Sequence, residues 1–290
     1  MGSSLEDVKM LLSIKRIRYG LTILVALTTT AALVILFSPF KYDQISYNVH
    51  LPPLAPSTFH WPYMVGTDNL GRDVLTRTFY AYILDVSCGL AVVALSGTIG
   101  LAIGLASGYL GGVVDGLLMR FMDVLISIPG FMLAIAIASV FGSSLFNAVI
   151  AVAIVTIPIY ARLARGVVLS TKENLFVVAA KEAGLGDSRI IFKHILPHVM
   201  PIFITQATME LSNAILYIAA LSFIGLGAQE PTPEWGLMMS IGRRYIREAW
   251  WPAVFPGAAM FLTVLSFNLI GDGLRDYLDP KKRLTAVRLP

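Results

Sequence analysis

Long apolar runs alternate with short polar segments along most of the chain. Six apolar windows of about 20 residues can be placed, each long enough to cross roughly 30 Å of hydrocarbon as a helix. They are 19–37, 83–105, 124–141, 145–164, 199–223 and 252–270. Pro129 and Pro158 interrupt two of these windows and predict kinks there. The pattern predicts an all-α membrane protein with six transmembrane helices and, because six is even, with both termini on one side.

The distribution of Lys and Arg decides which side that is. If the termini are cytoplasmic, sixteen of the 22 Lys and Arg fall in cytoplasmic segments, which is the bias expected of a membrane protein. We therefore expect cytoplasmic termini, an uncleaved first span and a multi-pass protein of the cell membrane. The expected organisation is a cytoplasmic segment 1–18, a first span and extracytoplasmic loop 19–82, a five-span core 83–272 containing a cytoplasmic loop 165–197, and a cytoplasmic tail 273–290.

Composition supports this class and excludes others. The chain has 290 residues, of which 56% are hydrophobic and 14% charged, and its mean hydropathy of +0.74 is too high for a soluble domain. The net charge of +4 comes without a basic patch interleaved with aromatic residues, so we expect no nucleic-acid partner. Cys88, the single cysteine, lies in an apolar run and is expected to be a buried packing thiol.

A polar stretch from Thr171 to Pro197 lies between two apolar windows. Residues 173–183 are mostly good helix formers, and Gly184 and Gly186 then stop that helix. Asp187 or Ser188 can cap a second helix, which leads to Pro197, where the next span begins. The side chains that can share a face of the first helix are Phe176, Val177, Ala180 and Ala183.

Small residues mark this stretch as a candidate contact surface. Ala179, Ala180, Ala183 and Gly184 would let a partner approach the backbone closely. The alternative is a tight cytoplasmic loop with ordinary helix caps, and the spacing alone leaves both interpretations open.

The extracytoplasmic loop before the second span ends in GTDNLGRDVLTR, residues 66–77. Asp68 or Asn69 with Gly71 predicts a turn, and Val74 begins a helix. The polar cluster could suggest catalysis, but no nucleophile with a base lies beside it, so a capped turn is the favoured interpretation. The motif residues singled out are Gly66, Asp68, Gly71, Arg72 and Asp73.

Glu210 lies near the middle of the fifth window and should not face lipid, because a charge there costs about 2.5 to 3.5 kcal/mol on insertion scales. Gln206, Glu210 and Asn213 are spaced by four and three residues and form a polar stripe on one helix face. The stripe either lines a translocation pathway, where Glu210 could attract an ammonium group or a cationic chelate, or makes a hydrogen bond between helices, which is the commoner role.

Glycine recurs at residues 100, 104 and 108, every fourth position of the second window and the turn after it. This spacing predicts close packing between helices. It does not predict a phosphate-binding loop, because the Lys-Ser/Thr ending of such loops is missing.

At this point the motifs resemble a known family. The order Ala179-Ala180, Gly184, His194 and Leu196-Pro197 resembles the cytoplasmic signature loop of permease subunits of binding-protein-dependent ABC importers, with Val178 where a glutamate is usual and His194 where an isoleucine is common. The segments 66–77, 221–227, 231–236 and 267–283 resemble the dipeptide, oligopeptide and nickel permeases of that family. The resemblance covers nearly the whole chain from Gly66 to Arg283.

The resemblance implies a type I ABC importer permease fold and a coupling loop that sits in a groove of an ATPase subunit. The coupling residues it implies are Phe176, Ala179, Ala180, Ala183, Gly184, Leu196 and Pro197. It also implies a second permease subunit in a heterodimer, two ATPase subunits and an extracytoplasmic solute-binding protein. No G-x-x-x-x-G-K-[ST] occurs in the chain, so ATP and Mg are expected on the partner chains, with no cofactor, metal or catalytic residue on this one.

Peptides are the expected cargo, with nickel, metal chelates and oligosaccharides as alternatives. A membrane-embedded enzyme is a rival interpretation, but the four His are dispersed and no H-E-x-x-H or G-x-S-x-G occurs. A purely structural scaffold is another rival, although it would give the polar loop no task.

Overall fold

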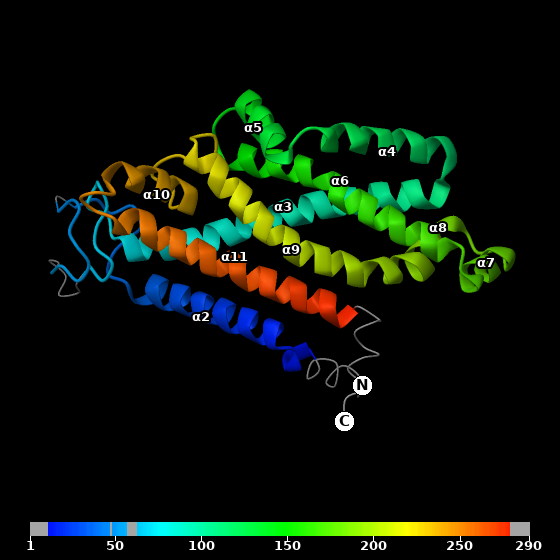
Figure 1. The fold of residues 1–290 in the computed structure, drawn as a ribbon, viewed down its shortest axis with the longest axis horizontal. Helices are drawn as coiled ribbons and strands as arrows, with labels where there is room; N and C mark the ends of the chain where they lie inside the picture. Colours follow the sequence, from blue (N-terminus) through cyan, green and yellow to red (C-terminus); the bar gives the residue numbers. More distant parts are fainter. Residues whose placement is uncertain (1–10, 47, 57–62, 279–290) are drawn as a thin grey trace.

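The computed structural model describes residues 11–46, 48–56 and 63–278, and the described residues are predominantly helical (Figure 1). The elements are α2 (Lys15–Phe37), α3 (Val74–Leu110), α4 (Gly112–Ser127), α5 (Gly130–Phe141), α6 (Leu145–Lys172), α7 (Leu175–Glu182), α8 (Asp187–Ile190), the π-helical η1 (Ile191–Ile195), α9 (Leu196–Phe223), α10 (Trp235–Gly242), the 3-10 helical η2 (Arg243–Tyr245) and α11 (Trp251–Leu278). The predicted all-α class is confirmed.

The long helices run side by side along the long axis of the molecule (Figure 1). The loop before α3 and the short α10 gather at one end, whereas α7 and α8 lie at the other. Arg16 of α2 and Asp276 of α11 form an ion pair of 3.0 Å, so the start of the first spanning helix meets the end of the last. This agrees with termini on one side, although most of the predicted segments 1–18 and 273–290 lies outside the described residues.

Five continuous stretches are long and apolar enough to cross a membrane: α2, α3, α6, the rod from Asp187 to Phe223, and α11. The predicted kink at Pro129 is confirmed, and it is large: α4 and α5 form a pair bent by 91°, so the window 124–141 is not one straight helix. Ile128 between them is extended, with φ −94° and ψ 133°, as the residue before a proline prefers, and Pro129 cannot continue the helix hydrogen bonds. At Pro158, by contrast, α6 continues as one helix.

The predicted close packing at the glycines of α3 is confirmed. A Cβ at Gly100 would lie 2.6 Å from the Cβ of Tyr160, and one at Gly104 would lie 2.5 Å from the carbonyl oxygen of Ala161. Both contacts are with α6, so larger side chains would push the two helices apart.

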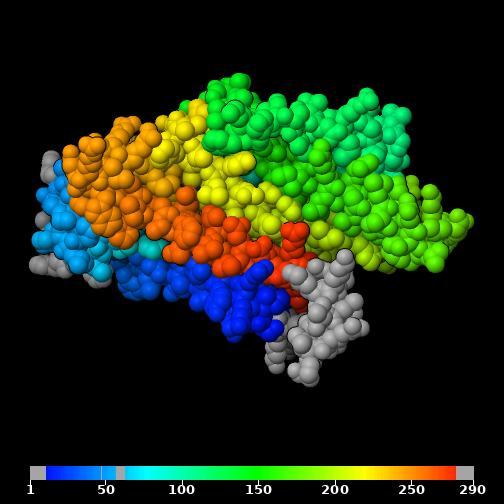
Figure 2. Space-filling view, in the orientation of Figure 1, coloured from blue at the N-terminus to red at the C-terminus, as the bar shows by residue number. Residues whose placement is uncertain are grey.

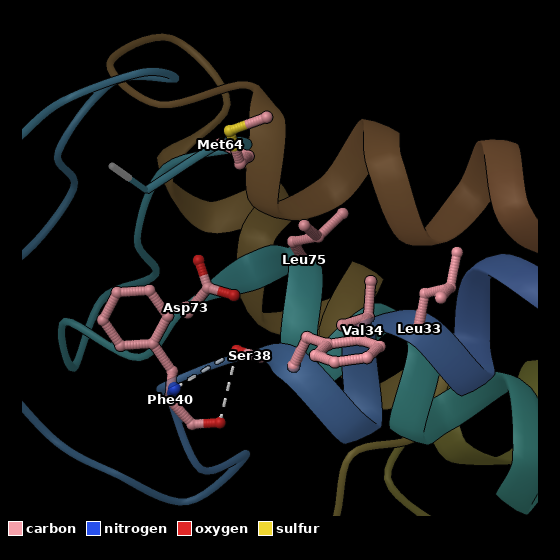
Figure 3. Close-up of a pocket in the computed structure, with 8 residues that line it drawn as sticks. Leu33, Val34, Ser38, Phe40, Met64, Asp73 and Leu75 are labelled. Carbon is pink, nitrogen blue, oxygen red and sulfur yellow. Dashed lines mark hydrogen bonds between the residues drawn. The ribbon is translucent and has the colours of Figure 1, made fainter. Parts of the chain in front are cut away.

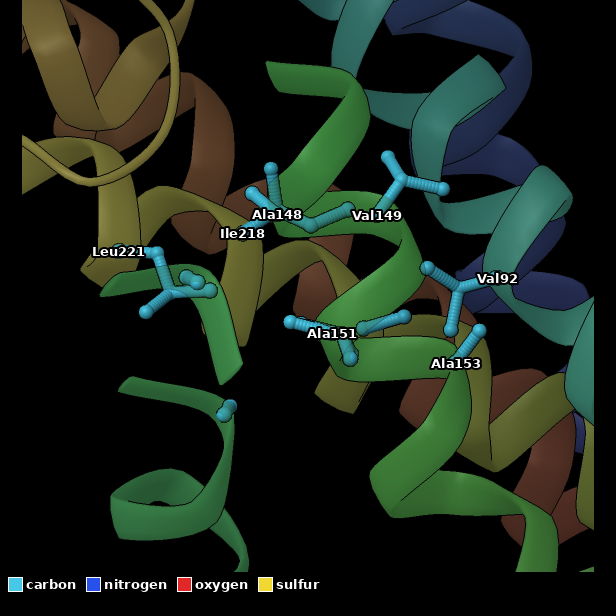
Figure 4. Packing of buried hydrophobic residues seen from close by; sticks show 11 residues of the cluster. Val92, Ala148, Val149, Ala151, Ala153, Ile218 and Leu221 are labelled. Atoms are coloured by element: carbon cyan, nitrogen blue, oxygen red, sulfur yellow. The ribbon is translucent and has the colours of Figure 1, made fainter. Parts of the chain in front are cut away.

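A buried apolar cluster joins α3, α5, α6 and α9 (Figure 4). Its labelled members are Val92, Ala148, Val149, Ala151, Ala153, Ile218 and Leu221. Four of them come from α6, which makes α6 the central helix of the bundle. Cys88 is partly buried against the same cluster.

Candidate functional site

The predicted helix, glycine bend and helix are present between α6 and α9. Leu185 N donates to Ala180 O at 3.1 Å, and Gly184 N donates to Lys181 O at 3.0 Å, which is the hydrogen-bond pattern of a Schellman helix end. Gly184 has φ +78°, a conformation that glycine adopts without steric cost. The bend therefore depends on Gly184 for its backbone shape.

The predicted cap of the second helix is wrong. Gly186 is the N-cap of α8, and Asp187 is already its first helical residue. The Asp187 Oδ1 accepts a hydrogen bond of 2.6 Å from the Tyr109 hydroxyl, so this carboxylate joins α8 to the end of α3 and does not cap its own helix.

The loop around α7 protrudes at one end of the molecule (Figure 2). Leu175 is 86% exposed and Phe176 42% exposed, although both are apolar. The residues predicted to couple fall into two groups. Those exposed to solvent are Phe176, Ala179, Ala183, Gly184 and Pro197, and those partly buried are Ala180 and Leu196.

The inner side of α7 is held by a buried apolar cluster. Val177 belongs to it, together with residues of α3, α6, α8 and α9, and Ala180, Leu185 and Leu196 pack against it. The Phe176 ring also lies 5.4 Å from that of His198, centroid to centroid. The face shared by residues 176, 180 and 183 is thus partly turned inward, and the exposed part of the surface is carried by Ala179, Ala183 and Gly184.

A wide cavity of about 650 Å³ opens beside this loop. Its walls come from α3, α6, α7 and α8, and its lining residues are Tyr109, Leu110, Lys172, Glu173, Val177, Val178, Lys181 and Asp187. Lys172 Nζ donates to the carbonyl oxygen of Gly108 at 2.9 Å. Together with the Tyr109 bond, this contact ties both ends of the loop to α3.

Charged contacts fasten α4 to α6 near the same end. The Arg165 guanidinium donates to both carboxylate oxygens of Asp115, at 2.6 and 2.7 Å, in the paired geometry that suits Arg and a carboxylate. Ser107 donates to Asp115 as well, and Arg162 donates to Asp123 at 2.5 Å. The loop is thus bonded directly to α3, and α4 is bonded in turn to α3 and α6.

Within the polar stripe on α9, Glu210 is buried, as predicted for a carboxylate in a span, whereas Gln206 is partly buried and Asn213 is exposed. Glu210 is only 6% exposed, and its two oxygens accept from Gln206 Nε2 at 2.8 Å and from Asn213 Nδ2 at 3.4 Å. All three residues belong to α9. Glu210 therefore has its hydrogen-bond partners within its own helix, and not the hydrogen bond between helices that was the alternative.

Glu210 and Asn213 also line a cavity of about 270 Å³. Its other walls come from α4, α5 and α6 and from the rest of α9, through Leu125, Ile126, Ile128, Gly130, Val152, Val155, Thr156, Ile159, Ala214 and Tyr217. The cavity is mostly apolar with a few convergent polar groups, which is the usual character of a small-molecule site. It lies against the break between α4 and α5, so the irregular backbone at Ile128 borders a cavity.

The predicted turn before α3 is confirmed. Asp68 Oδ1 accepts from the amides of Leu70 at 2.8 Å and Arg72 at 3.0 Å, and Gly71 has φ +74°. Asp73 Oδ2 accepts from Thr76 N at 2.7 Å and caps α3. Burial raises the pKa of Asp73, against the effect of this cap.

The same motif also joins distant loops. Arg72 is 2% exposed and donates to Asp68 at 2.6 Å and to Glu230 at 2.9 Å. Trp251 Nε1 donates to Thr67 O at 3.0 Å. These contacts bind the loop before α3 to the segment around α10, so the motif is a structural junction and not a catalytic cluster.

A further cavity of about 320 Å³ lies between the end of α2 and the start of α3 (Figure 3). It is lined by Leu33, Val34, Phe37, Ser38, Phe40, Met64, Asp73 and Leu75. Its polar members are already engaged, since Phe40 N donates to Ser38 Oγ at 3.2 Å and Asp73 caps α3. The cavity therefore offers little to orient a charged ligand.

Sequence reasoning missed two buried acids, Asp85 in α3 and Glu234 before α10, which are 2% and 0% exposed. A signal for Asp85 was available, because an acid inside an apolar window is rarely without a role. No local pattern could pair it with a residue 149 positions away.

Comparison with known proteins places the chain among transport proteins. Residues 100–284 match the family described as binding-protein-dependent transport system inner membrane component. The chain is 45% identical over 264 residues to the probable D,D-dipeptide transport system permease protein DdpC of Escherichia coli (strain K12), covering 88% of each protein. It is 44% identical over 264 residues to the dipeptide transport system permease protein DppC of Alkalihalophilus pseudofirmus, covering 91% of this chain and 85% of the relative.

A third relative is the glutathione transport system permease protein GsiD of Pectobacterium atrosepticum, 42% identical over 242 residues, with 83% of this chain and 77% of the relative covered. Among solved structures, an inward-facing conformation of the MetNI methionine ABC transporter matches with a TM-score of 0.48 and 22% identity, covering 69% of this chain and 97% of that one.

Proposed function

Because the chain belongs to the family of binding-protein-dependent transport system inner membrane components, we propose that it forms half of the translocation pathway of an ATP-driven importer of di- and oligopeptides. It is a multi-pass permease subunit of an ABC importer and a transport component, with ATP hydrolysis on partner subunits. The observation that carries the choice of cargo is the high identity, over most of the chain, to permeases named for dipeptides.

The assembly we propose has four membrane-associated chains and a soluble one. A second permease subunit completes the pathway as a heterodimer, two ATPase subunits bind ATP and Mg, and an extracytoplasmic solute-binding protein delivers the cargo. Coupling occurs where the exposed residues of the α7 loop meet an ATPase groove. The exposed Ala179, Ala183 and Gly184 support this, because they allow close approach.

Motion then passes from the ATPase into the spans. The hydrogen bonds of Tyr109 to Asp187 and of Lys172 to Gly108 O connect the loop with α3. The rod from Asp187 to Phe223 continues from the loop without interruption. In this proposal the loop is a two-state element biased by nucleotide on the partner chains.

The pathway runs beside Glu210. A peptide carries a free ammonium group, and the Glu210 carboxylate at the wall of a mostly apolar cavity can attract it. Gln206 and Asn213 hold the carboxylate in place without neutralising it. The same stripe would accept a cationic chelate, so the cargo must be tested directly.

Reconstitution tests the proposed function. The complete transporter, with its binding protein, should accumulate a labelled dipeptide in proteoliposomes when ATP is supplied to the ATPase side, and nickel chelates and oligosaccharides should compete poorly. Liposomes that carry this chain alone should neither transport nor hydrolyse ATP. Uptake by the isolated chain, or preference for an oligosaccharide, would overturn the proposal.

A cysteine at position 210 tests the pathway, on a background in which Cys88 is replaced. A membrane-impermeant thiol reagent should label Cys at 210 in at least one nucleotide state, because the position lines a route that opens to water. Position 222 offers a matched control: Ser222 lies on the same helix and is 1% exposed but does not line the cavity. If position 210 is never labelled and Glu210→Gln transports normally, the pathway assignment is wrong.

A further inference from the structure

Two acids are buried together at the end of the bundle that carries α10. Asp85 lies in the fourth turn of α3, and Glu234 is the N-cap of α10. Their residues are 2% and 0% exposed. Asp85 interacts electrostatically with Glu234. Because both are acids, the two carboxylates would repel each other if both were ionised.

One oxygen of each carboxyl is engaged by the first turn of α10. Trp235 N donates to Asp85 Oδ2 at 3.0 Å, and Leu237 N donates to Glu234 Oε2 at 2.7 Å. The other two oxygens, Asp85 Oδ1 and Glu234 Oε1, are buried without a hydrogen-bond partner. A buried carboxylate oxygen without a partner is unfavourable, and here there are two.

The neighbouring elements supply little compensating charge. On α3, Arg77 directs its guanidinium to the carbonyl oxygens of Tyr42 and Pro231, and its Nε lies 3.7 Å from Asp68 Oδ2, so it is engaged elsewhere. On α9, the Ser222 hydroxyl forms a hydrogen bond with Glu234 and also accepts one from the amide of Ala228, but it carries no charge. The partial positive charge at the start of α10 can balance about half a unit charge, which leaves most of the charge of two ionised carboxylates unbalanced.

We propose that Asp85 and Glu234 form a proton-binding site, in which one retained proton lets the pair carry a single negative charge and fastens α10 to α3. The proton resides on one of the two unpartnered oxygens, which then becomes a hydrogen-bond donor. When the proton is lost as the external pH rises, two like charges remain in a buried site, and the attachment of α10 weakens.

The packing explains why the attachment matters. Trp235, which follows Glu234 and donates its backbone N–H to Asp85, is fully buried, and its Nε1 donates to Thr78 O at 3.0 Å. At Gly236 there is no room for a Cβ against the Ala219 backbone of α9. The start of α10 is therefore wedged between α3 and α9, and repulsion at the pair acts directly on this wedge.

The pKa of Glu234 supports the proposal. Burial raises it from 4.5 to about 7. A carboxyl whose pKa is raised by folding contributes stability that is complete below the unfolded value of 4.5 and is lost as the pH rises through about 7. The expected window of change is therefore between these two values.

Infrared difference spectroscopy of the assembled transporter in lipid nanodiscs tests the retained proton. Wild type is compared with the double variant Asp85→Asn/Glu234→Gln, whose amides keep acceptor oxygens for the amides of Trp235 and Leu237. At neutral pH the wild type should show a carbonyl band of a protonated carboxylic acid that shifts in D2O and is missing from the double variant. If wild type and the double variant show the same carbonyl bands, the wild-type pair retains no proton and the proposal is overturned.

Thermal unfolding of the same samples tests the fastening. The unfolding temperature of wild type, measured relative to the double variant, should fall by at least about 2 °C as the pH rises from about 5 to about 8. Glu248→Gln, a change of an exposed acid at the same end, should keep both the band and the slope. Parallel profiles for wild type and the double variant would overturn the proposal. If the double variant does not fold, Asp85→Asn alone replaces it under the same criteria.

Discussion

The two ends of the molecule use glycine in opposite ways. At the α7 loop, a Cβ at Gly184 would meet nothing within 4 Å. In the junction before α3, a Cβ at Gly66 would collide with the Leu51 carbonyl oxygen and would lie 2.7 Å from Trp251 Nε1. Both glycines have positive φ, so both positions favour glycine for their backbone conformation, and only their surroundings differ.

This difference distinguishes the end that fills its space with the chain's own residues from the end that leaves a surface open to a partner. The junction fills its space with its own residues and buries Arg72 between Asp68 and Glu230. The α7 loop instead leaves small residues and apolar side chains open to the outside. A crowded glycine indicates internal packing, whereas an open one beside exposed Ala and Leu is what a partner surface requires.

The largest effect on stability is expected from Arg72→Met. The change leaves the buried Asp68 without its main partner, which typically costs about 3 to 5 kcal/mol. Arg162→Met is the matched control at the other end, because the pair of Arg162 and Asp123 is 48% and 58% exposed and should contribute no more than about 1 kcal/mol. Thermal unfolding in nanodiscs measures both, and equal losses would contradict the contrast between the ends.

A smaller effect separates the glycines themselves. Ala at either Gly66 or Gly184 must adopt a left-handed conformation, at about 1 to 2 kcal/mol. Only Gly66→Ala adds a collision, which costs about 1 to 3 kcal/mol more. Denaturant unfolding of the two variants should therefore rank Gly66→Ala as the more damaging, and the reverse order would refute the comparison.

The smallest effect on stability is expected from Ala179→Trp. Ala179 is exposed on α7, so the free energy of unfolding should change by no more than about 0.5 kcal/mol. Transport and stimulation of the partner ATPase should nevertheless be lost, because the large ring blocks close approach. This variant is cleaner than Gly184→Trp, which also strains the backbone, and than Ala180→Trp, which disturbs the cluster under α7.

Ala26→Trp, at an exposed position on α2, is the control for the bulk of the ring and should transport normally. If Ala179→Trp couples as well as this control does, the α7 loop is not the coupling surface.

Local patterns predicted the features that local physics controls. The apolar windows found the spans, the Asp68 and Gly71 signal found the turn, and the spacing of Gly100 and Gly104 found the tight contact with α6. The start of α3 at Val74 was placed by the turn chemistry even though the apolar window begins only at residue 83.

Features that depend on tertiary contacts were not predicted. The kink at Pro129 was predicted but its size was not, because the same signal at Pro158 accompanies a continuous helix whereas Pro129 marks a 91° break. Asp187 resembled a cap in sequence, but Tyr109 from another helix engages it. The spacing along α9 correctly placed Gln206 and Asn213 beside Glu210. The cavity that Glu210 lines could not be predicted, because its other walls come from α4, α5 and α6.

The unbroken rod from Asp187 to Phe223 spans 37 residues, and its π-helical turn at Ile191–Ile195 lies next to the α7 loop. At 1.5 Å per residue, Glu210 is about 35 Å from the start of the rod. Pivoting there by about 10° would sweep the carboxylate through about 6 Å, roughly the advance of one helical turn. A small rotation at the α7 end of the rod would therefore become a displacement of several ångströms at Glu210.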